Sequence, residues 1–457
     1  MNSHRFSARP ALKHRLVVAA AAALMAGSLF VPGHTQSLTG LRKIDISTGR
    51  EMIKTLRKEV ERNYYDPAYR GVDLEAKFKA AEEKVGQAQS LGQVYGIVGQ
   101  PLLDLNDMHT FFIPPPRPAR IDYGWQMQII GNRCFAVAVR PFSDAEKKGL
   151  KVGDEILRVN GYPINRTIIW KLSLINYVMR PGTTPHIIVQ SPDGQQRELD
   201  TLPKVTQNQQ VLRYETSSNG RIDTRNLINW VVDEARWRRH RFQDVRDDLT
   251  VWQCPHLDID ETTLNGFLGA VKKKKSLILD LRYNIGGREE ILEWFAGFFF
   301  DQDKKICDFK GRKERKSLTA HSRGENGFKG ELVVLVDSMT GGAAELFARM
   351  VQLEKRGKVI GDLTAGTTMK ATLHRFELGE NPFAASISEA EAIMSDGKSL
   401  ERVGVTPDEI SLPTAQDLAA FRDPVLARAA ELLSVKLDPA KAGTLFPIEW
   451  FKDLLKE

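Results

Sequence analysis

Hydrophobic and polar positions repeat with two different periods along this chain, and the change of period separates its regions. In the first region apolar residues recur every three or four positions, which is typical of amphipathic helices. We therefore predict a helical segment over residues 45–115, ended by three prolines at 114–116. Residues 120–203 instead show short alternating runs between turn residues, which predicts a smaller β-rich unit. The predicted helices are 50–64, 74–84 and 90–105, and the predicted strands are 133–139, 155–159, 186–190 and 197–202.

From residue 249 onward, short apolar β-branched runs alternate with helical patterns, which predicts an α/β core within residues 204–412. A helix is also expected over 224–244, and residues 413–457 read as an amphipathic helix at 414–433 with a tail. The core strands are predicted at 249–254, 276–281, 332–336, 358–361 and 383–394, and its helices at 261–271, 289–299 and from 343 onward.

The sharpest local signal in the core is the segment 331–350, ELVVLVDSMTGGAAELFARM. A buried strand at 332–336 precedes Thr340, the pair Gly341-Gly342 and a helix that begins at Ala343. Such a strand-to-helix turn presents free backbone N–H groups at the helix start, which suit negative charge. Many hydrolases hold a nucleophile there. This turn carries neither serine nor cysteine at its tip.

The N-terminus combines a cluster of basic residues with an apolar run. Four basic residues, Arg5, Arg9, Lys13 and Arg15, precede the apolar run Leu16–Val31. Residues 1–36 thus have the outline of a signal peptide, with a retained membrane anchor as the alternative, so we expect an exported, periplasmic or extracellular protein. Without these residues the net charge falls from +7 to +3. The basic composition therefore gives no reason to expect a nucleic-acid partner.

Three cysteines, Cys134, Cys254 and Cys307, are widely spaced and odd in number. They show neither a metal-binding spacing nor a disulfide framework, although a single bridge is compatible with export. We expect no metal and no cofactor.

The segment 141–164, PFSDAEKKGLKVGDEILRVNGYPI, resembles a PDZ domain of the kind found in bacterial proteases. Such domains bind the C-terminal residues of a chain by adding them as an edge strand. The resemblance implies that the carboxylate-binding loop lies at Gly124, Trp125, Gln126 and Met127, although these residues depart from the usual glycine-flanked apolar pattern. The alternative is that the unit is a structural spacer.

Five motifs follow one another along the chain: the lead-in at 105–115, LILDLRYNIGG at 277–287, LVVLVDSMTGGAAELFARMVQ at 332–352, VIGDLTAG at 359–366 and SDGKSLERVGVTPD at 395–408. With these motifs in this order, residues 45–412 as a whole resemble the carboxyl-terminal processing (tail-specific) family of serine peptidases. The resemblance implies a crotonase-like or ClpP-like βαβ core with an inserted PDZ-like domain, and acyl transfer on peptide or protein substrates.

The resemblance also implies where the catalytic residues lie. The family serine stands three residues before Glu345, which is the position of Gly342, and the family lysine falls at Thr367. A tricorn-like branch uses histidine and glutamate instead, for which this chain offers His109 as base and Glu401 as its partner. The implied oxyanion donors are the backbone N–H groups near Gly286, Gly287 and Ala343.

Three hypotheses follow. The chain is a peptidase scaffold with weak or absent proteolysis, an active protease that uses Thr340 (or, further back, Ser338) as nucleophile, or a non-catalytic scaffold for peptide tails. In each case the expected partner is a peptide or protein, with a C-terminal tail as one candidate, and membrane contact only through the N-terminal segment.

Overall fold

The computed structural model describes residues 43–115, 119–175, 184–207, 239–379 and 381–449. All of them belong to one compact unit, Gly40–Glu457. The predicted signal segment 1–36 lies outside the described residues. Within them, no helix combines the length and the apolar character needed to cross a bilayer.

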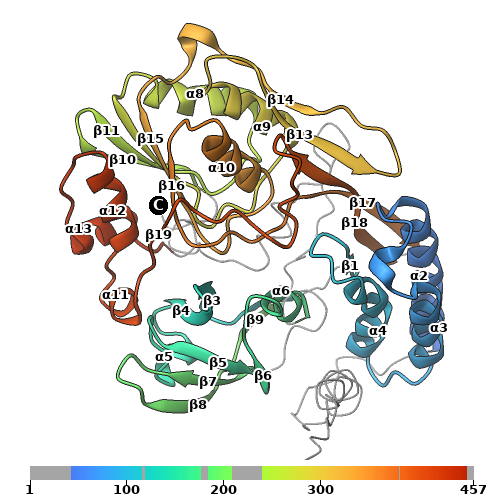
Figure 1. The fold of residues 1–457 in the computed structure, drawn as a ribbon. Helices are drawn as coiled ribbons and strands as arrows, with labels where there is room; N and C mark the ends of the chain where they lie inside the picture. The colour runs from blue at the N-terminus through green and yellow to red at the C-terminus, as the bar shows by residue number, and fades with distance from the viewer. Residues whose placement is uncertain (1–42, 116–118, 176–183, 208–238, 380, 450–457) are drawn as a thin grey trace, which may run out of the picture. The chain divides into compact units, whose positions relative to one another are not determined.

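A six-stranded sheet forms the centre of the mixed α/β fold, in the order β10-β11-β12-β15-β16-β19 (Figure 1). Its pairs are parallel except for the antiparallel edge pair β10–β11. Parallel strands require crossover connections, and helices supply them here. The strands are β10 (Arg241–Arg246), β11 (Leu249–Gln253), β12 (Ser276–Asp280), β15 (Glu331–Val336), β16 (Lys358–Gly361) and β19 (Glu409–Ile410).

Both faces of this sheet are buried, because alternate residues of each strand enter different cores. Leu332, Val334 and Val336 of β15 pack with the helices α8 (Glu261–Val271), α9 (Glu289–Gly297) and α10 (Ala343–Leu353). Val333 and Leu335 pack with two of the C-terminal helices. The C-terminal helices are α11 (Ala415–Ala419), α12 (Pro424–Leu432) and α13 (Pro439–Thr444), and residues of α12 and α13 enter this second core.

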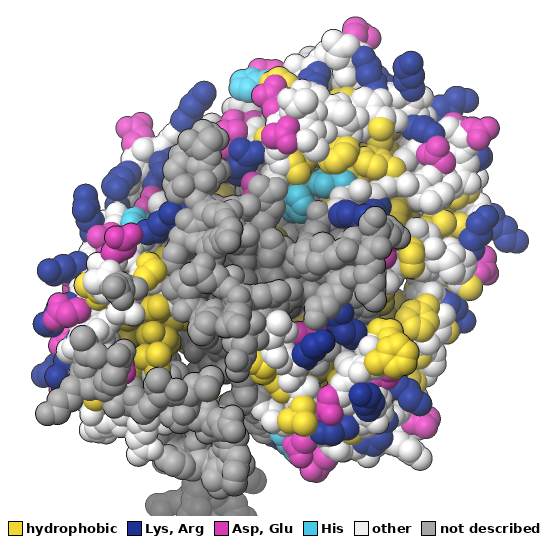
Figure 2. Space-filling model, turned by 180° about the vertical axis from the view of Figure 1, so that it is seen from behind, with side chains coloured by type: hydrophobic (Ala, Val, Ile, Leu, Met, Phe, Trp, Pro, Cys, Tyr) yellow, Lys and Arg dark blue, Asp and Glu magenta, His cyan; other side chains and the backbone are white. Residues whose placement is uncertain are grey.

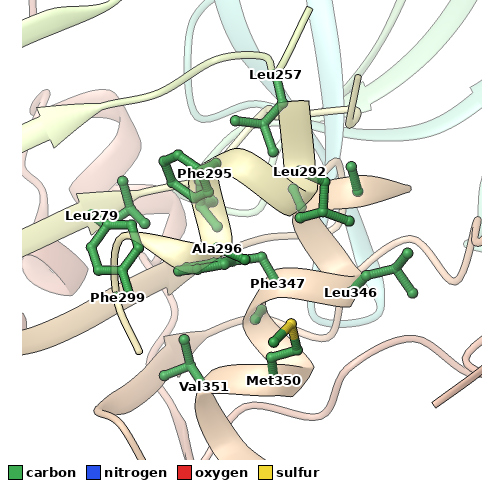
Figure 3. Packing of buried hydrophobic residues seen from close by; sticks show 14 of the residues in the cluster. Leu257, Leu279, Leu292, Phe295, Ala296, Phe299, Leu346, Phe347, Met350 and Val351 are labelled. Carbon is green, nitrogen blue, oxygen red and sulfur yellow. The ribbon is translucent and has the colours of Figure 1, made fainter. Parts of the chain in front are cut away.

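Aromatic packing fixes α10 against α9 (Figure 3). The Phe347 ring lies 4.8 Å from the ring of Phe295 and 5.2 Å from that of Phe299, both edge-on. Edge-to-face pairs of this kind stabilise by about 0.5–1.5 kcal/mol beyond burial. The start of α10, which forms one side of the turn at 337–342, is therefore held rigidly.

A second, antiparallel sheet has the order β1-β18-β13-β14, with β17 also paired to β18. Phe383, Ala385 and Ile387 of β18 pack against the N-terminal helices. This sheet contains β1 (Phe111–Ile113), β13 (Lys304–Gly311), β14 (Leu318–Ala320), β17 (Met369–Leu378) and β18 (Asn381–Met394), and the helices are α2 (Lys43–Asn63), α3 (Leu74–Val85) and α4 (Leu91–Asp104).

The β-rich unit predicted at 120–203 has its own core, and its main sheet has the order β3-β4-β5-β7-β8 with β6 paired to β5. β9 pairs with β2, which assigns residues 204–207 to this unit rather than to the α/β core. Its elements are β2 (Ala119–Asp122), β3 (Trp125–Ile130), β4 (Arg133–Val139), α5 (Asp144–Lys147), β5 (Glu155–Val159), β6 (Tyr162–Pro163), α6 (Ile169–Ser173), β7 (His186–Gln190), β8 (Gln196–Asp200) and β9 (Lys204–Gln207).

One helix prediction is wrong at its C-terminal end, and another is wrong in its continuity. Of the helix predicted over 224–244, residues 224–238 lie outside the described part, and the remainder enters β10, where pairing with β11 overrides the helical pattern. The helix predicted over 414–433 is split into α11 and α12. The break falls at Asp423, whose side chain caps α12 by accepting the Leu426 N–H, and at Pro424, which cannot continue α11.

The three cysteines are buried free thiols. Lys and Arg side chains are interspersed with Asp and Glu side chains over the described surface that Figure 2 draws.

Candidate functional site

The turn between β15 and α10 is built around the Asp337 carboxylate. Its Oδ1 accepts the backbone N–H groups of Met339 and Thr340, both at 2.9 Å, and that of Tyr283 at 3.1 Å. Because three donors converge on one oxygen, the turn keeps one shape and stays attached to the segment that follows β12.

Thr340 is part of this framework. Its side chain is fully buried, its hydroxyl donates to the Leu281 carbonyl at 2.8 Å, and the hydroxyl oxygen accepts the Asp337 N–H at 2.9 Å. Ser338 donates to the carbonyl of Ile129 in the β-rich unit. Both hydroxyls are therefore engaged in holding the turn, and neither occupies the position of the missing serine.

Gly342 has φ 55° and ψ −125°, a conformation that residues with a side chain adopt only under strain. A Cβ added there would meet nothing closer than the Ile285 carbonyl oxygen at 3.2 Å. Strained positive-φ geometry at a sharp strand-to-helix turn is typical of nucleophile positions in hydrolases. The position thus keeps that geometry without the nucleophile.

Two of the three expected oxyanion donors remain available. Ala343 is the first residue of α10, where the helix offers no acceptor, and Gly287 is exposed. Within the described chain neither N–H donates to a protein acceptor. The Gly286 N–H, in contrast, donates to Asn284 Oδ1 at 2.8 Å. Gly286 instead allows its segment to lie close to the start of α10, since a Cβ on it would be only 2.8 Å from the Ala343 nitrogen.

Glu345 joins the turn at Gly342 to the segment 366–367 through hydrogen bonds, a role that the sequence did not reveal. The fully buried carboxylate accepts the N–H groups of Gly342 (3.1 Å), Gly366 (2.7 Å) and Thr367 (2.8 Å) and the Thr364 hydroxyl. Burial raises the pKa of Glu345 to about 7, although these hydrogen bonds oppose the rise. Its position three residues into a helix with no serine or threonine cap was the one available signal.

Glu401 lies beside this cluster. One carboxylate oxygen accepts the Thr368 N–H at 2.9 Å, and the other is buried without a partner in the described residues. Burial, reinforced by the charge of Asp107, raises the pKa of Glu401 to about 7. Thr368 follows Thr367, whose carbonyl accepts the Gly342 N–H at 2.9 Å, so Glu401 is attached to the segment that borders the turn.

His109 is half-buried between α4 and β1, and its backbone N–H donates to Asp107 at 2.9 Å. Its Nε2 is buried and has no hydrogen-bond partner in the part of the chain that the structure describes. No hydrogen bond joins the His109 ring to Glu401 among the described residues. Asp107, a fully buried residue to which the sequence analysis assigns no role, accepts the His109 backbone N–H, and its charge raises the pKa of Glu401.

The residues predicted to bind a peptide carboxylate begin the edge strand of the β-rich unit. Gly124 has a positive φ of 75°, Trp125 is buried, and Gln126 and Met127 are half-buried. Further along the same strand, Gln128 Nε2 donates to the Asp337 carboxylate at 2.6 Å. The far end of this edge is therefore in contact with the turn of the α/β core.

A second contact joins the same two parts. Arg166 forms an ion pair with Asp362 at 2.6 Å and donates to the Leu363 carbonyl at 3.0 Å, while Asp362 accepts the Gly131 N–H at 2.8 Å. Burial raises the pKa of Asp362 against the opposing charge of Arg166. In the described residues no group of three or more His, Cys, Asp or Glu side chains is arranged to hold a metal ion.

Residues 258–411 match Peptidase family S41. Carboxy-terminal processing protease CtpA of Bacillus subtilis is 22% identical over 406 residues, which cover 86% of this chain and 75% of that protein. A tricorn protease homolog of Streptomyces coelicolor is 22% identical over 401 residues, 81% of this chain, but the match spans only 31% of that longer protein. Mature CPAF shares the fold, with a TM-score of 0.61 at 14% identity over 82% of this chain and 95% of that chain.

Proposed function

We propose that this chain, whose residues 258–411 form an S41 peptidase segment similar to carboxyl-terminal processing proteases, binds peptide or protein chains without efficiently cleaving them. The observation that carries the proposal is Gly342. Its backbone has the geometry of a nucleophile position, and it is surrounded by free N–H donors and the Glu345 hydrogen bonds, but it has no hydroxyl.

The competing hypothesis of an active protease that uses Thr340 has less support. A nucleophile must be free to lose its proton to a base and to approach a carbonyl. The Thr340 hydroxyl is fully buried and donates to Leu281, and Ser338 donates to the β-rich unit. Either hydroxyl would have to abandon the bonds that shape the turn.

A further part of the proposal concerns the surroundings of the site. In the proposed arrangement His109 is the former base and Glu401 its partner, and the β-rich unit is PDZ-like, with the chain exported through residues 1–36. Two buried atoms that have no hydrogen-bond partner among the described residues, His109 Nε2 and Glu401 Oε1, support retention of a polar site. A purely structural role of the β-rich unit is the alternative, supported by the contacts of Gln128 and Arg166 with the core.

The test compares the purified chain with a Gly342→Ser variant on casein, an unfolded protein substrate. We expect cleavage only by the variant, because serine restores the hydroxyl next to existing oxyanion donors. Clear cleavage by the wild type would contradict the proposal, most directly if Thr340→Val abolished it.

A double variant tests the base. The double variant Gly342→Ser/His109→Ala should lose the regained activity. The control is Gly342→Ser/His374→Ala, which should keep the activity, because His374 lies on β17 and pairs with Glu389. If the first double variant still cleaves casein, His109 is not the base.

A further inference from the structure

An arginine from the connection between α2 and α3 reaches the segment that carries His109. We propose that this residue, Arg70, is a positioning residue for His109. It holds the segment 106–110 by a hydrogen bond and offsets the charge of two buried acids, Asp107 and Glu401. The inference rests on the proposed function, in which His109 is the former base and Glu401 its partner.

Arg70 lies in an unusual stretch of backbone. Three successive residues, Tyr69, Arg70 and Gly71, have positive φ values of 49°, 57° and 78°. For residues with a side chain this conformation costs free energy, and it persists where surrounding contacts enforce it. Here the Asp66 carboxylate enforces it, because it accepts the backbone N–H groups of Ala68 at 2.9 Å and Arg70 at 2.7 Å. Strained residues of this kind cluster at functional sites.

The side chain of Arg70 binds to a second residue with left-handed backbone. Its Nη1 donates to the carbonyl of Asn106 at 3.2 Å, and Asn106 has a φ of 52°. Asn106 follows α4 and donates its N–H to the Leu103 carbonyl at 3.1 Å, so it ends that helix. Arg70 therefore fixes the point at which the chain leaves α4 toward His109.

The residues that follow hold His109 through Asp107. The fully buried Asp107 carboxylate accepts the His109 N–H at 2.9 Å with one oxygen and the Thr110 hydroxyl at 3.0 Å with the other. The Thr110 hydroxyl oxygen in turn accepts the N–H of Ser388, on β18, at 3.0 Å. His109 is thus carried on a short segment that is attached to β18 at one end and to Arg70 at the other.

Arg70 also brings positive charge to two buried acids. Burial, reinforced by the charge of Asp107, raises the pKa of Glu401, and Arg70 opposes this rise. Burial lowers the pKa of Arg70, but neighbouring groups, Asp107 and Glu401 among them, raise it above its ordinary value. Carboxylates repel each other more strongly where water is excluded, and the cation offsets that repulsion. Because Asp107 holds the His109 segment, loss of the cation would displace His109 from its proposed partner.

The first measurement follows the His109 ring by NMR in the full chain, with isotope-labelled histidine and the His109 signal assigned by its loss in His109→Gln. We expect Arg70→Gln to shift or broaden this signal, because the segment 106–110 loses its attachment. Arg356→Gln is the matched control and should leave the signal unchanged. Arg356 is likewise half-buried and donates to three backbone carbonyls, but it lies near the start of β15, at the opposite end of that strand from the turn.

The second measurement uses Gly342→Ser, the variant expected to cleave casein. Addition of Arg70→Gln should lower kcat by about tenfold or more and leave KM within about twofold, because a displaced base slows proton removal without weakening substrate binding. Arg70→Lys keeps the positive charge and a donor for Asn106, so it should recover most of the loss. Arg356→Gln should change neither constant.

A double variant shows whether Arg70 acts through Asp107. In the same Gly342→Ser parent, Asp107→Asn alone should lower kcat, because it removes the charge that Arg70 offsets. Addition of Arg70→Gln should then lower kcat little further, since residues that act as one unit have non-additive effects. Losses that multiply in full would overturn the link between Arg70 and Asp107.

The outcomes separate the two proposals. An unchanged His109 signal in Arg70→Gln overturns the positioning role, whether or not any variant cleaves casein. Equal losses of kcat in Arg70→Gln and Arg356→Gln, or a change of KM alone, overturn it as well. If the His109 signal responds to Arg70→Gln but Gly342→Ser does not cleave casein, the positioning by Arg70 stands and the proposed function of the site fails.

Discussion

The hydroxyl of Thr340 can be removed with almost no change of shape by Thr340→Val. The side chain is fully buried, so the added methyl group has no access to water. The Leu281 carbonyl would keep the Asn284 N–H at 3.1 Å, but the Asp337 N–H would lose its acceptor. The difference in stability between the wild type and Thr340→Val therefore measures the hydrogen bonds made by the Thr340 hydroxyl.

The expected cost follows from that inventory. An orphaned buried donor costs about 1–3 kcal/mol, and the lost hydrogen bond to Leu281 adds about 1 kcal/mol. We expect Thr340→Val to lower the free energy of unfolding by roughly 2–4 kcal/mol. Thr340→Ser keeps the hydroxyl and removes one methyl group, for which about 1 kcal/mol is expected.

Thermal unfolding of the three proteins, followed by circular dichroism, measures the difference. Thr340→Val should melt roughly 1–3 °C below Thr340→Ser, since about 1 kcal/mol corresponds to roughly 1 °C in a unit of roughly 400 residues. If valine melts as high as the wild type, the hydroxyl does not hold the turn, and the structural argument against Thr340 as a nucleophile fails.

Three other predictions concern the same region. Gly342→Ser should destabilise by about 1–3 kcal/mol, because φ 55° and ψ −125° form a sparsely populated conformation for a residue with a side chain. The loss is measurable as a lower melting temperature, and an unchanged temperature would contradict the strained geometry. Arg166→Ala leaves Asp362 without its ion-pair partner and should cost about 2 kcal/mol, reduced from the fully buried case because Arg166 is partly exposed; Arg166→Lys should recover part of it in the same melting assay. Burial raises the pKa of Glu401 to about 7 in the folded protein, above the value of about 4.5 in the unfolded chain. The contribution of this group to the free energy of unfolding is therefore largest below about pH 4.5 and is lost as the pH rises through 7. Relative to the wild type, Glu401→Gln should therefore gain up to roughly 3 kcal/mol between pH 5 and pH 8, and parallel pH profiles would refute this.

Local patterns predicted most of the core elements correctly. The strand Lys358–Gly361 and the helix Glu261–Val271 have the predicted bounds, since apolar periodicity and an N-cap aspartate both act within a few residues. The strand Arg241–Arg246 was missed because its pairing partner β11, not its own pattern, decides its conformation.

The sequence by itself determined that position 342 has no nucleophile and that a strand, two glycines and a helix surround it, because these are properties of residue type and local spacing. Only the tertiary structure decided that the Thr340 hydroxyl donates to Leu281 and that the N–H groups of Gly366 and Thr367 both donate to Glu345. It also decided that Gln128 contacts Asp337. Each of these depends on hydrogen-bond partners that are distant in sequence, and side-chain type alone does not specify which partner folding brings within reach.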